Sequence, residues 1–296
     1  MSNRMKNTLF DKINALIVCI VLLTILWPLL YIVSASISDP MLVNKGKVLL
    51  IPKALSLEAY KRVFQNNEIW IGYRNTIFYT VVGTLLNLVL TFSSAFVLSK
   101  RDLVGKKFFM LLFIITMFFN GGIIPTYLVV KKLDLLDKVW SIIIPNAISV
   151  WNVILVINYF TNEIPYELQE ASKIDGCSNY KQLVCIMLPL AKPLIGVMAL
   201  FYGASHWNNY FNALIYISNR DLYPLQLFLR EILIQNQMSD SMKMSGNSIE
   251  SMAKQAQMAQ SIKYAVAIVS TLPVLIVFPF VQEYFQKGLM AGAIKG

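Results

Sequence analysis

The side chains of this sequence that could do chemistry are amides and aromatic rings within apolar runs. They cluster in His206-Trp207-Asn208-Asn209-Tyr210, where amides, which both donate and accept hydrogen bonds, stand beside aromatic faces. Such a set suits the hydroxyls and ring faces of a sugar. The candidate substrate-path residues are Asn120, Tyr127, Asn152, Trp207, Asn208 and Tyr210. Hydrogen bonding between helices is the competing explanation for each, because polar side chains inside a span usually face protein or water.

Catalytic, metal and cofactor chemistry are not indicated. The single histidine, His206, is interpreted as a packing or path-lining residue. Cys19, Cys177 and Cys185 lack the paired spacing of a disulfide framework or metal site. The sequence also lacks the G-x-x-x-x-G-K-[ST] phosphate loop and any buried pair of carboxylates suited to a proton relay. We therefore predict no catalytic, metal or cofactor site, and no binding of ATP by such a loop.

A polar segment, 161–190, interrupts the apolar second half of the chain and carries the signals of two helices. Pro165 suits the first position of a helix, and glutamates in its first turns favour the positive end of the helix dipole. Gly176 can end this helix in the left-handed conformation, and a second helix can begin after Ser178. The packing face of the first helix is predicted to be Leu168, Ala171 and Ser172. An ordinary interfacial connector would show the same signals, so they leave a partner undecided.

These residues must be positioned by helices that cross a membrane. The chain of 296 residues is 56% hydrophobic and only 14% charged, with a mean hydropathy of +0.58, whereas soluble domains carry about 25% charged residues. An apolar run of about 20 residues is long enough to cross a bilayer as a helix. Six runs meet this length: 13–35, 75–99, 108–130, 139–160, 190–217 and 264–285. We predict an all-α integral membrane protein with six transmembrane helices.

The net charge of +10 is attributed to loops, where Lys and Arg meet anionic lipid headgroups, and not to nucleic-acid binding. The Lys and Arg totals on the two sides of the membrane are nearly equal, so they do not set the orientation. The tail 1–12 and the short basic loop 99–107 favour a cytoplasmic N-terminus. The two long loops, 38–70 and 218–263, would then lie outside.

The polar segment resembles the signature loop of permease subunits of binding-protein-dependent ABC importers. The resemblance rests on Glu170-Ala171-Ser172, followed at the family's spacing by Gly176, Ile186 and Leu188-Pro189. Ser172 is a departure, because a second alanine is usual there, but serine is nearly as small. The resemblance implies coupling helices that dock into a groove of a cytoplasmic ATPase. It assigns this coupling to Glu170, Ala171, Ser172, Asp175, Gly176, Ile186, Leu188 and Pro189.

Other stretches resemble the carbohydrate-uptake branch of this family, which is the maltose-permease-like group and, within it, the LplC-type oligosaccharide permeases. These stretches are 120–136, 206–217, 224–233 and 278–296. The resemblance implies a type I ABC importer permease fold over 13–285, with cytoplasmic coupling helices in 161–190. It also implies that the tails 1–12 and 286–296 are cytoplasmic, with the second tail reaching toward the ATPase.

The resemblance further implies a subunit of an ATP-driven importer in the bacterial cytoplasmic membrane. Its expected partners are a second homologous permease in a heterodimer, two ATPase subunits that carry ATP and Mg²⁺, and an extracytoplasmic sugar-binding lipoprotein that delivers an oligosaccharide. The chain itself is not expected to be an enzyme or to bind nucleic acid. The alternative is a secondary transporter or a membrane-embedded protein of another class. A secondary transporter would usually show an inverted repeat and buried ionisable groups, and neither is found.

Overall fold

The structure is a computed structural model that describes residues 9–242, 262–279 and 282. Within these ranges every regular element is a helix, apart from an isolated antiparallel bridge between Ser38 and Leu55. The all-α prediction is therefore confirmed for the described part of the chain. The chain divides into two compact units. The units comprise Met1–Asn67 with Leu229–Leu272, and Glu68–Phe228 with Pro273–Gly296.

The first unit contains the N-terminal span. Helix α1 (Leu9–Ser36) is 28 residues long and exposes apolar side chains along most of its length, as expected of a helix that faces lipid or a partner subunit. It includes the whole predicted span 13–35. The short helices α2 (Pro40–Asn44) and α3 (Glu58–Gln65) follow, so the predicted external loop 38–70 is partly helical. The buried residues of a small core in this unit are Ala35, Val43 and Val48.

The second unit begins with α4 (Asn67–Ser99), a helix of 33 residues that extends roughly 50 Å at 1.5 Å per residue. It starts earlier than the predicted span 75–99, because the segment after α13 holds its first turns. The Asn75 side-chain amide donates to the backbone carbonyls of Asp221 (2.7 Å) and Tyr223 (3.0 Å), and the Thr76 hydroxyl accepts from the Leu225 N–H (2.8 Å). A hydropathy window does not detect such tertiary contacts.

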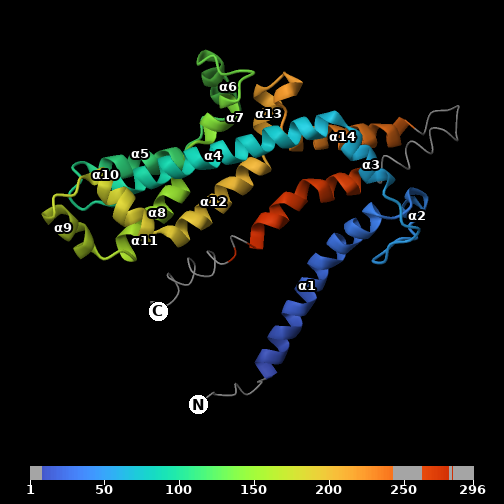
Figure 1. Ribbon diagram of the computed structural model, residues 1–296, viewed down its shortest axis with the longest axis horizontal. Coiled ribbons are helices and arrows are strands. Elements are labelled where there is room, and N and C mark those ends of the chain that lie inside the picture. The colour runs from blue at the N-terminus through green and yellow to red at the C-terminus, as the bar shows by residue number, and fades with distance from the viewer. Residues whose placement is uncertain (1–8, 243–261, 280–281, 283–296) are drawn as a thin grey trace. The chain divides into compact units, whose positions relative to one another are not determined.

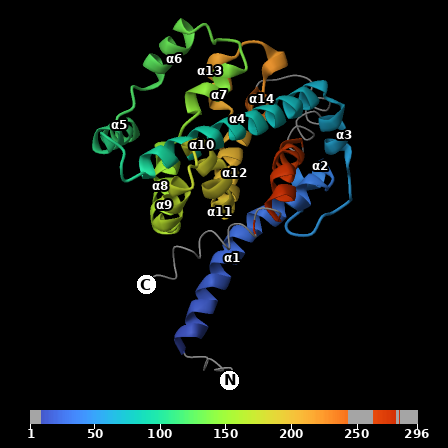
Figure 2. The ribbon, with the colours of Figure 1, turned by 60° about the vertical axis from the view of Figure 1, so that its left-hand side comes forward.

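The predicted span 108–130 is not one helix, and the structure corrects this prediction. Helices α5 (Lys106–Phe118) and α6 (Ile123–Lys132) meet at 114°, and in Figures 1 and 2 α6 turns away from the axis of α5. The break lies at Asn120-Gly121-Gly122. Gly122 has φ +88°, a value that favours glycine, and its N–H donates to the Asn120 side-chain oxygen (2.9 Å).

The predicted span 139–160 is also bent. It consists of α7 (Trp140–Ile143) with the 3-10 turn η1 (Ile144–Asn146), followed at an angle of 51° by α8 (Val150–Asn162). Ser149 begins α8, because its side chain accepts from the Asn152 N–H (3.5 Å). Proline in η1 and this new cap explain why the helix restarts in a different direction.

The predicted span 190–217 is too long. Helix α12 (Lys192–Trp207) ends at Trp207, and α13 (Phe211–Tyr216) is a separate short helix. The two asparagines between them cause the break. The Asn208 amide donates to the Ala204 carbonyl (2.8 Å), and the Asn209 side-chain oxygen accepts from the Asn212 N–H (3.2 Å). Side chains that bond to nearby backbone in this way favour helix ends over helix interiors.

The last span is the helix Ile262–Pro279. The end of the predicted span 264–285 reaches beyond it into residues that, except for 282, lie outside the described part. The described chain has three helices that are individually long and apolar enough to cross a membrane, and six spans when each of three bent pairs counts as one. This agrees with the predicted six-span fold.

The main core of the second unit lies between α4, α8, α12 and the segment that precedes α12. Phe92 of α4 meets Phe160 of α8 edge to face, with ring centroids 6.0 Å apart. Val156, Met187 and Met198 are buried in the same cluster. This packing provides a firm base for the polar segment 161–190.

Candidate functional site

The polar segment forms two short helices joined at a glycine, as predicted. Helix α9 (Tyr166–Ile174) begins one residue after Pro165, which therefore caps the helix instead of occupying its first position. Its end is closed by the N–H of Gly176, which donates to the Lys173 carbonyl (3.1 Å), and by the N–H of Cys177, which donates to the Ser172 carbonyl (2.9 Å). Gly176 has φ +73°, which is the left-handed conformation that ends many helices.

The second helix of the segment is anchored in the core. Ser178 caps α10 (Asn179–Gln182) by accepting from the Lys181 N–H (3.3 Å). The chain continues as a π-helical turn, η2 (Leu183–Met187), and then as α11 (Leu188–Leu190). Pro189 lacks the N–H that a regular helix would need, which accounts for the irregular turn before it.

The residues that the sequence analysis assigned to coupling fall into two groups. Glu170, Ala171, Asp175, Gly176 and Pro189 are exposed, whereas Ile186 and Leu188 are half-buried and Ser172 is buried. Leu188 packs against the main core. The loop therefore has an outer part that is accessible to another molecule and an inner part that holds it to the spans.

The predicted packing face of α9 is wrong in one respect. Ser172 is only 6% exposed and points into this chain, whereas Ala171 is exposed and Leu168 is 43% exposed. Gln169, which lies three residues before Ser172, is buried with it. A helix turns about 100° per residue, so neighbouring residues such as Ala171 and Ser172 need not face the same surroundings.

Two further residues missed by the sequence analysis hold α9 in place. The side-chain amide of Gln182 donates to the Ser172 hydroxyl (2.7 Å) and to the Gln169 carbonyl (3.0 Å), and its oxygen accepts from the Lys100 ammonium (3.1 Å). Gln182 is 1% exposed. A glutamine four residues after a serine cap carries no signal that it will be buried, so the sequence alone could not have identified it.

The six candidate substrate-path residues come from three separate regions. Asn120 lies at the α5–α6 bend and Tyr127 on α6, where its ring stacks on Tyr216 at 6.2 Å. Asn152 is buried in the first turn of α8. Trp207, Asn208 and Tyr210 lie at the end of α12 and just beyond it. The Asn120 side-chain oxygen and the Asn208 amide nitrogen bond to backbone of their own segments, so these bonds do not join one helix to another.

A polar chain inside the second unit joins α4, α12 and η1. The Asn87 amide donates to the Asn146 carbonyl (2.7 Å), and its oxygen lies 2.7 Å from His206 Nε2, so this ring nitrogen is the donor. His206 is buried, which supports the interpretation of this residue as a packing residue. Asn87 was not selected from the sequence, although its place inside an apolar run was the same signal that selected the other asparagines.

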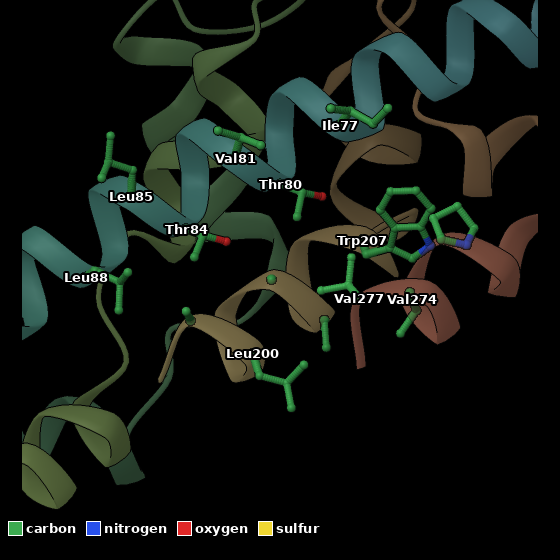
Figure 3. A pocket seen from close by; sticks show the side chains of 14 residues that line it. Ile77, Thr80, Val81, Thr84, Leu85, Leu88, Leu200, Trp207, Val274 and Val277 are labelled. Atoms are coloured by element: carbon green, nitrogen blue, oxygen red, sulfur yellow. The ribbon is translucent and has the colours of Figure 1, made fainter. Parts of the chain in front are cut away.

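A cavity of about 570 Å³ lies in the second unit between α4, α12 and residues 273–277. Figure 3 shows Thr80 and Thr84 of α4 and Trp207 of α12 around it. The two threonine hydroxyl oxygens are buried without a hydrogen-bond partner among the described residues. The other lining side chains are apolar except for the Trp207 indole N–H. This cavity therefore offers few of the polar groups that a sugar requires.

Comparisons with known proteins agree with the geometry. Residues 69–291 match the family described as binding-protein-dependent transport system inner membrane component. The chain is 39% identical to the polygalacturonan/rhamnogalacturonan transport system permease protein YtcP of Bacillus subtilis, over 99% of this chain and 100% of that protein. It is 40% identical to protein LplC of the same species, over 100% of this chain and 98% of that protein.

A solved structure is also similar over nearly the whole chain. It is the crystal structure of a bacterial ABC transporter involved in the import of the acidic polysaccharide alginate. One of its chains superposes on this one with a TM-score of 0.83 at 34% identity, covering 96% of this chain and 99% of that chain.

Proposed function

Because this chain belongs to the family of inner membrane components of binding-protein-dependent transport systems, we propose that it is one of two permease subunits of an ATP-driven oligosaccharide importer. Membership of a permease family and the apolar helices support a multi-pass membrane protein. In this proposal the chain forms the transport path, and the enzyme activity resides in a separate ATPase. The relatives named for polygalacturonan, rhamnogalacturonan and alginate support a substrate built of sugars.

The observation that carries this proposal is the division of α9 into two faces. Ala171 and Ile174 are exposed on one side, with Ile174 86% exposed, whereas Gln169 and Ser172 are fixed against the rest of the chain. A short helix with one free face and one fixed face suits docking into a groove of another protein. In this proposal the groove belongs to an ATPase, which binds the ATP and Mg²⁺.

The mechanism follows from this docking. Closure of the ATPase dimer on ATP would move α9. The spans attached to the polar segment 161–190, here called the coupling loop, would then turn the translocation path outward. A binding lipoprotein would then deliver the oligosaccharide near the long loop 218–263, and hydrolysis would return the path to the inward state. The second permease would complete the path. Both termini would lie in the cytoplasm, on the side of the ATPase.

The alternative of a secondary transporter is not favoured, because the family is defined by transport that depends on a binding protein. The experiment that tests the proposal uses the full complex with its sister permease, ATPase and binding protein in proteoliposomes. We expect uptake of labelled oligosaccharide that requires both ATP and the binding protein. Neutral and uronic-acid oligosaccharides are compared to define the substrate class. Uptake driven by an ion gradient without ATP would contradict the proposal.

A further inference from the structure

We propose that Lys100 and Gln182 are positioning residues that link the coupling loop to α4, so that α9, α10 and the end of α4 move as one body. The loop is already joined by the chain to α8 and α12. The link would strengthen a third route, through α4, whose buried residues share the main core with Leu183 and Met187 of the loop. This inference rests on the proposed function, since it concerns how the ATPase drives the permease.

The buried part of the link is centred on Gln182. Both protons of its amide nitrogen are used, one by the Ser172 hydroxyl and one by the Gln169 carbonyl, while its oxygen accepts from Lys100. The Ser172 hydroxyl in turn donates to the Gln169 carbonyl at 2.8 Å. A buried amide with all its partners in place orients its neighbours, and loss of one partner is costly. The usual alanine at position 172 could not accept the bond from Gln182.

Lys100 is the first residue after α4 and brings a charge to this site. Its ammonium contacts the side-chain oxygens of Gln182 and Asn179 and lies 4.6 Å from the centroid of the Phe96 ring. Burial lowers the pKa of Lys100, and repulsion from Lys173 adds to this effect. The two amide oxygens and the aromatic face compensate for the water that the ammonium loses.

The next two residues of the connector 100–105 contact α9 itself. The Arg101 guanidinium lies 4.2 Å from the centroid of the Tyr166 ring at the start of α9, and the Asp102 carboxylate is 2.7 Å from the Lys173 ammonium near its end. The hydrogen bond from Lys173 lowers the pKa of Asp102. Each contact is exposed and weak alone, because solvent screens it. Together they hold both ends of α9 against the connector.

Helix α4 is well placed to receive motion from this link. Two of its buried polar residues are bonded to α12: the Thr91 and Tyr202 hydroxyls are 2.7 Å apart, and Asn87 is bonded to His206. Movement of the end of α4 would therefore be shared with α12 through side chains that are buried inside the unit. Coupling that passes through contiguous hydrogen bonds and packed helices is the physical requirement for such transmission.

The test compares Lys100→Met and Gln182→Leu with two matched controls in the reconstituted complex. Lys107→Met makes the same substitution at an exposed lysine of the next helix, and Lys100→Arg keeps the positive charge. We expect the first two variants to retain ATPase association but to move about fivefold less sugar per ATP, the lower end for a coupling of this kind. Both controls should transport as the unaltered protein does. Unchanged sugar per ATP in Lys100→Met would overturn the proposal, and so would loss of ATPase association.

A second measurement examines the link without relying on transport. Spin labels at Val104 and Lys181, which are both exposed, report the distance between the connector and α10 in a variant whose three cysteines are replaced by serine. We expect a narrow distance distribution that broadens in Lys100→Met and stays narrow in Lys107→Met. An unchanged distribution in Lys100→Met would overturn the link even if the complex transports no sugar. If Gln182→Leu does not reach the membrane, Ser172→Ala is used instead of it, because this substitution removes only one hydroxyl group from the network.

Discussion

At the scale of single residues, the direction of a side chain decides what a signature position does. Ser172 occupies a position that family resemblance connects with ATPase docking, yet its hydroxyl is bonded to Gln182 and Gln169 inside the chain. Ala171 and Ile174 provide the accessible surface instead. For Ser172, the hydroxyl group therefore matters more than the small size of the side chain.

Gly176 provides a prediction at this scale. A Cβ at Gly176 would meet no atom within 4 Å, so its φ of +73° is the single obstacle to substitution. Valine should cost roughly 1–2 kcal/mol in this conformation, whereas asparagine tolerates it better. We expect Gly176→Val to reach the membrane but to lower sugar transported per ATP, and Gly176→Asn to stay close to the unaltered protein. Membrane content and uptake per ATP are measured together, and equal coupling in both variants would refute the role of this turn.

At the scale of elements, the contact between α4 and α12 depends on a small residue facing a large one. Gly83 of α4 lies against the His206 ring, and a Cβ there would be 2.5 Å from two ring atoms. This close approach brings Asn87 within hydrogen-bonding distance of His206. Small residues at helix contacts in membranes serve this purpose generally.

The two glycines of this contact allow a matched comparison. Gly83→Ala should destabilise the protein by about 1–3 kcal/mol, because the added methyl group overpacks against a ring that is already hydrogen-bonded. Gly203→Ala should be neutral or stabilising by up to about 1 kcal/mol, because alanine favours a helix and its Cβ would lie 3.7 Å from the nearest atom. Thermal denaturation of the purified complex in detergent measures both. Equal thermal midpoints for Gly83→Ala and Gly203→Ala would show that the Gly83 contact is not tight.

At the scale of the whole molecule, orientation in the membrane decides whether the coupling loop faces the ATPase. The 26 Lys and Arg residues are divided too evenly between the two sides of the membrane to set it. The proposed function requires that 161–190 and 100–105 face the cytoplasm, and that the loop between α6 and α7 faces outward. The six spans then alternate with both termini inside.

Single cysteines test this orientation. Val104 and Leu133 are 90% and 60% exposed and should lie on opposite sides of the membrane. In a background lacking the native cysteines, Leu133→Cys should react with an impermeant maleimide in intact cells. Val104→Cys should react only after the membrane is opened. The reverse pattern would invert the topology and remove the coupling loop from the ATPase side.

Much of the coupling loop could be predicted from sequence, since its signals are local. Gly176 ends α9 and Ser178 caps α10 as predicted, because left-handed backbone and side-chain caps depend on a few neighbouring residues. The breaks within the apolar runs were harder to predict from the sequence. Asn120-Gly121-Gly122 and Asn208-Asn209 bend or end helices, but a window of about 20 residues averages their effect away.

The sequence by itself determined the membrane class, the six apolar runs and the two helices of the coupling loop. Composition, run length and capping residues act within one segment and need no knowledge of the rest of the chain. The tertiary structure decided that Ser172 faces inward, that Lys100 reaches Gln182 and that Gly83 admits His206. Lys100 and Gln182, like Gly83 and His206, are far apart in sequence, and their contacts form only when the helices pack together. Ser172 and Gln182 lie in one segment, but their bond depends on how α9 folds back against α10.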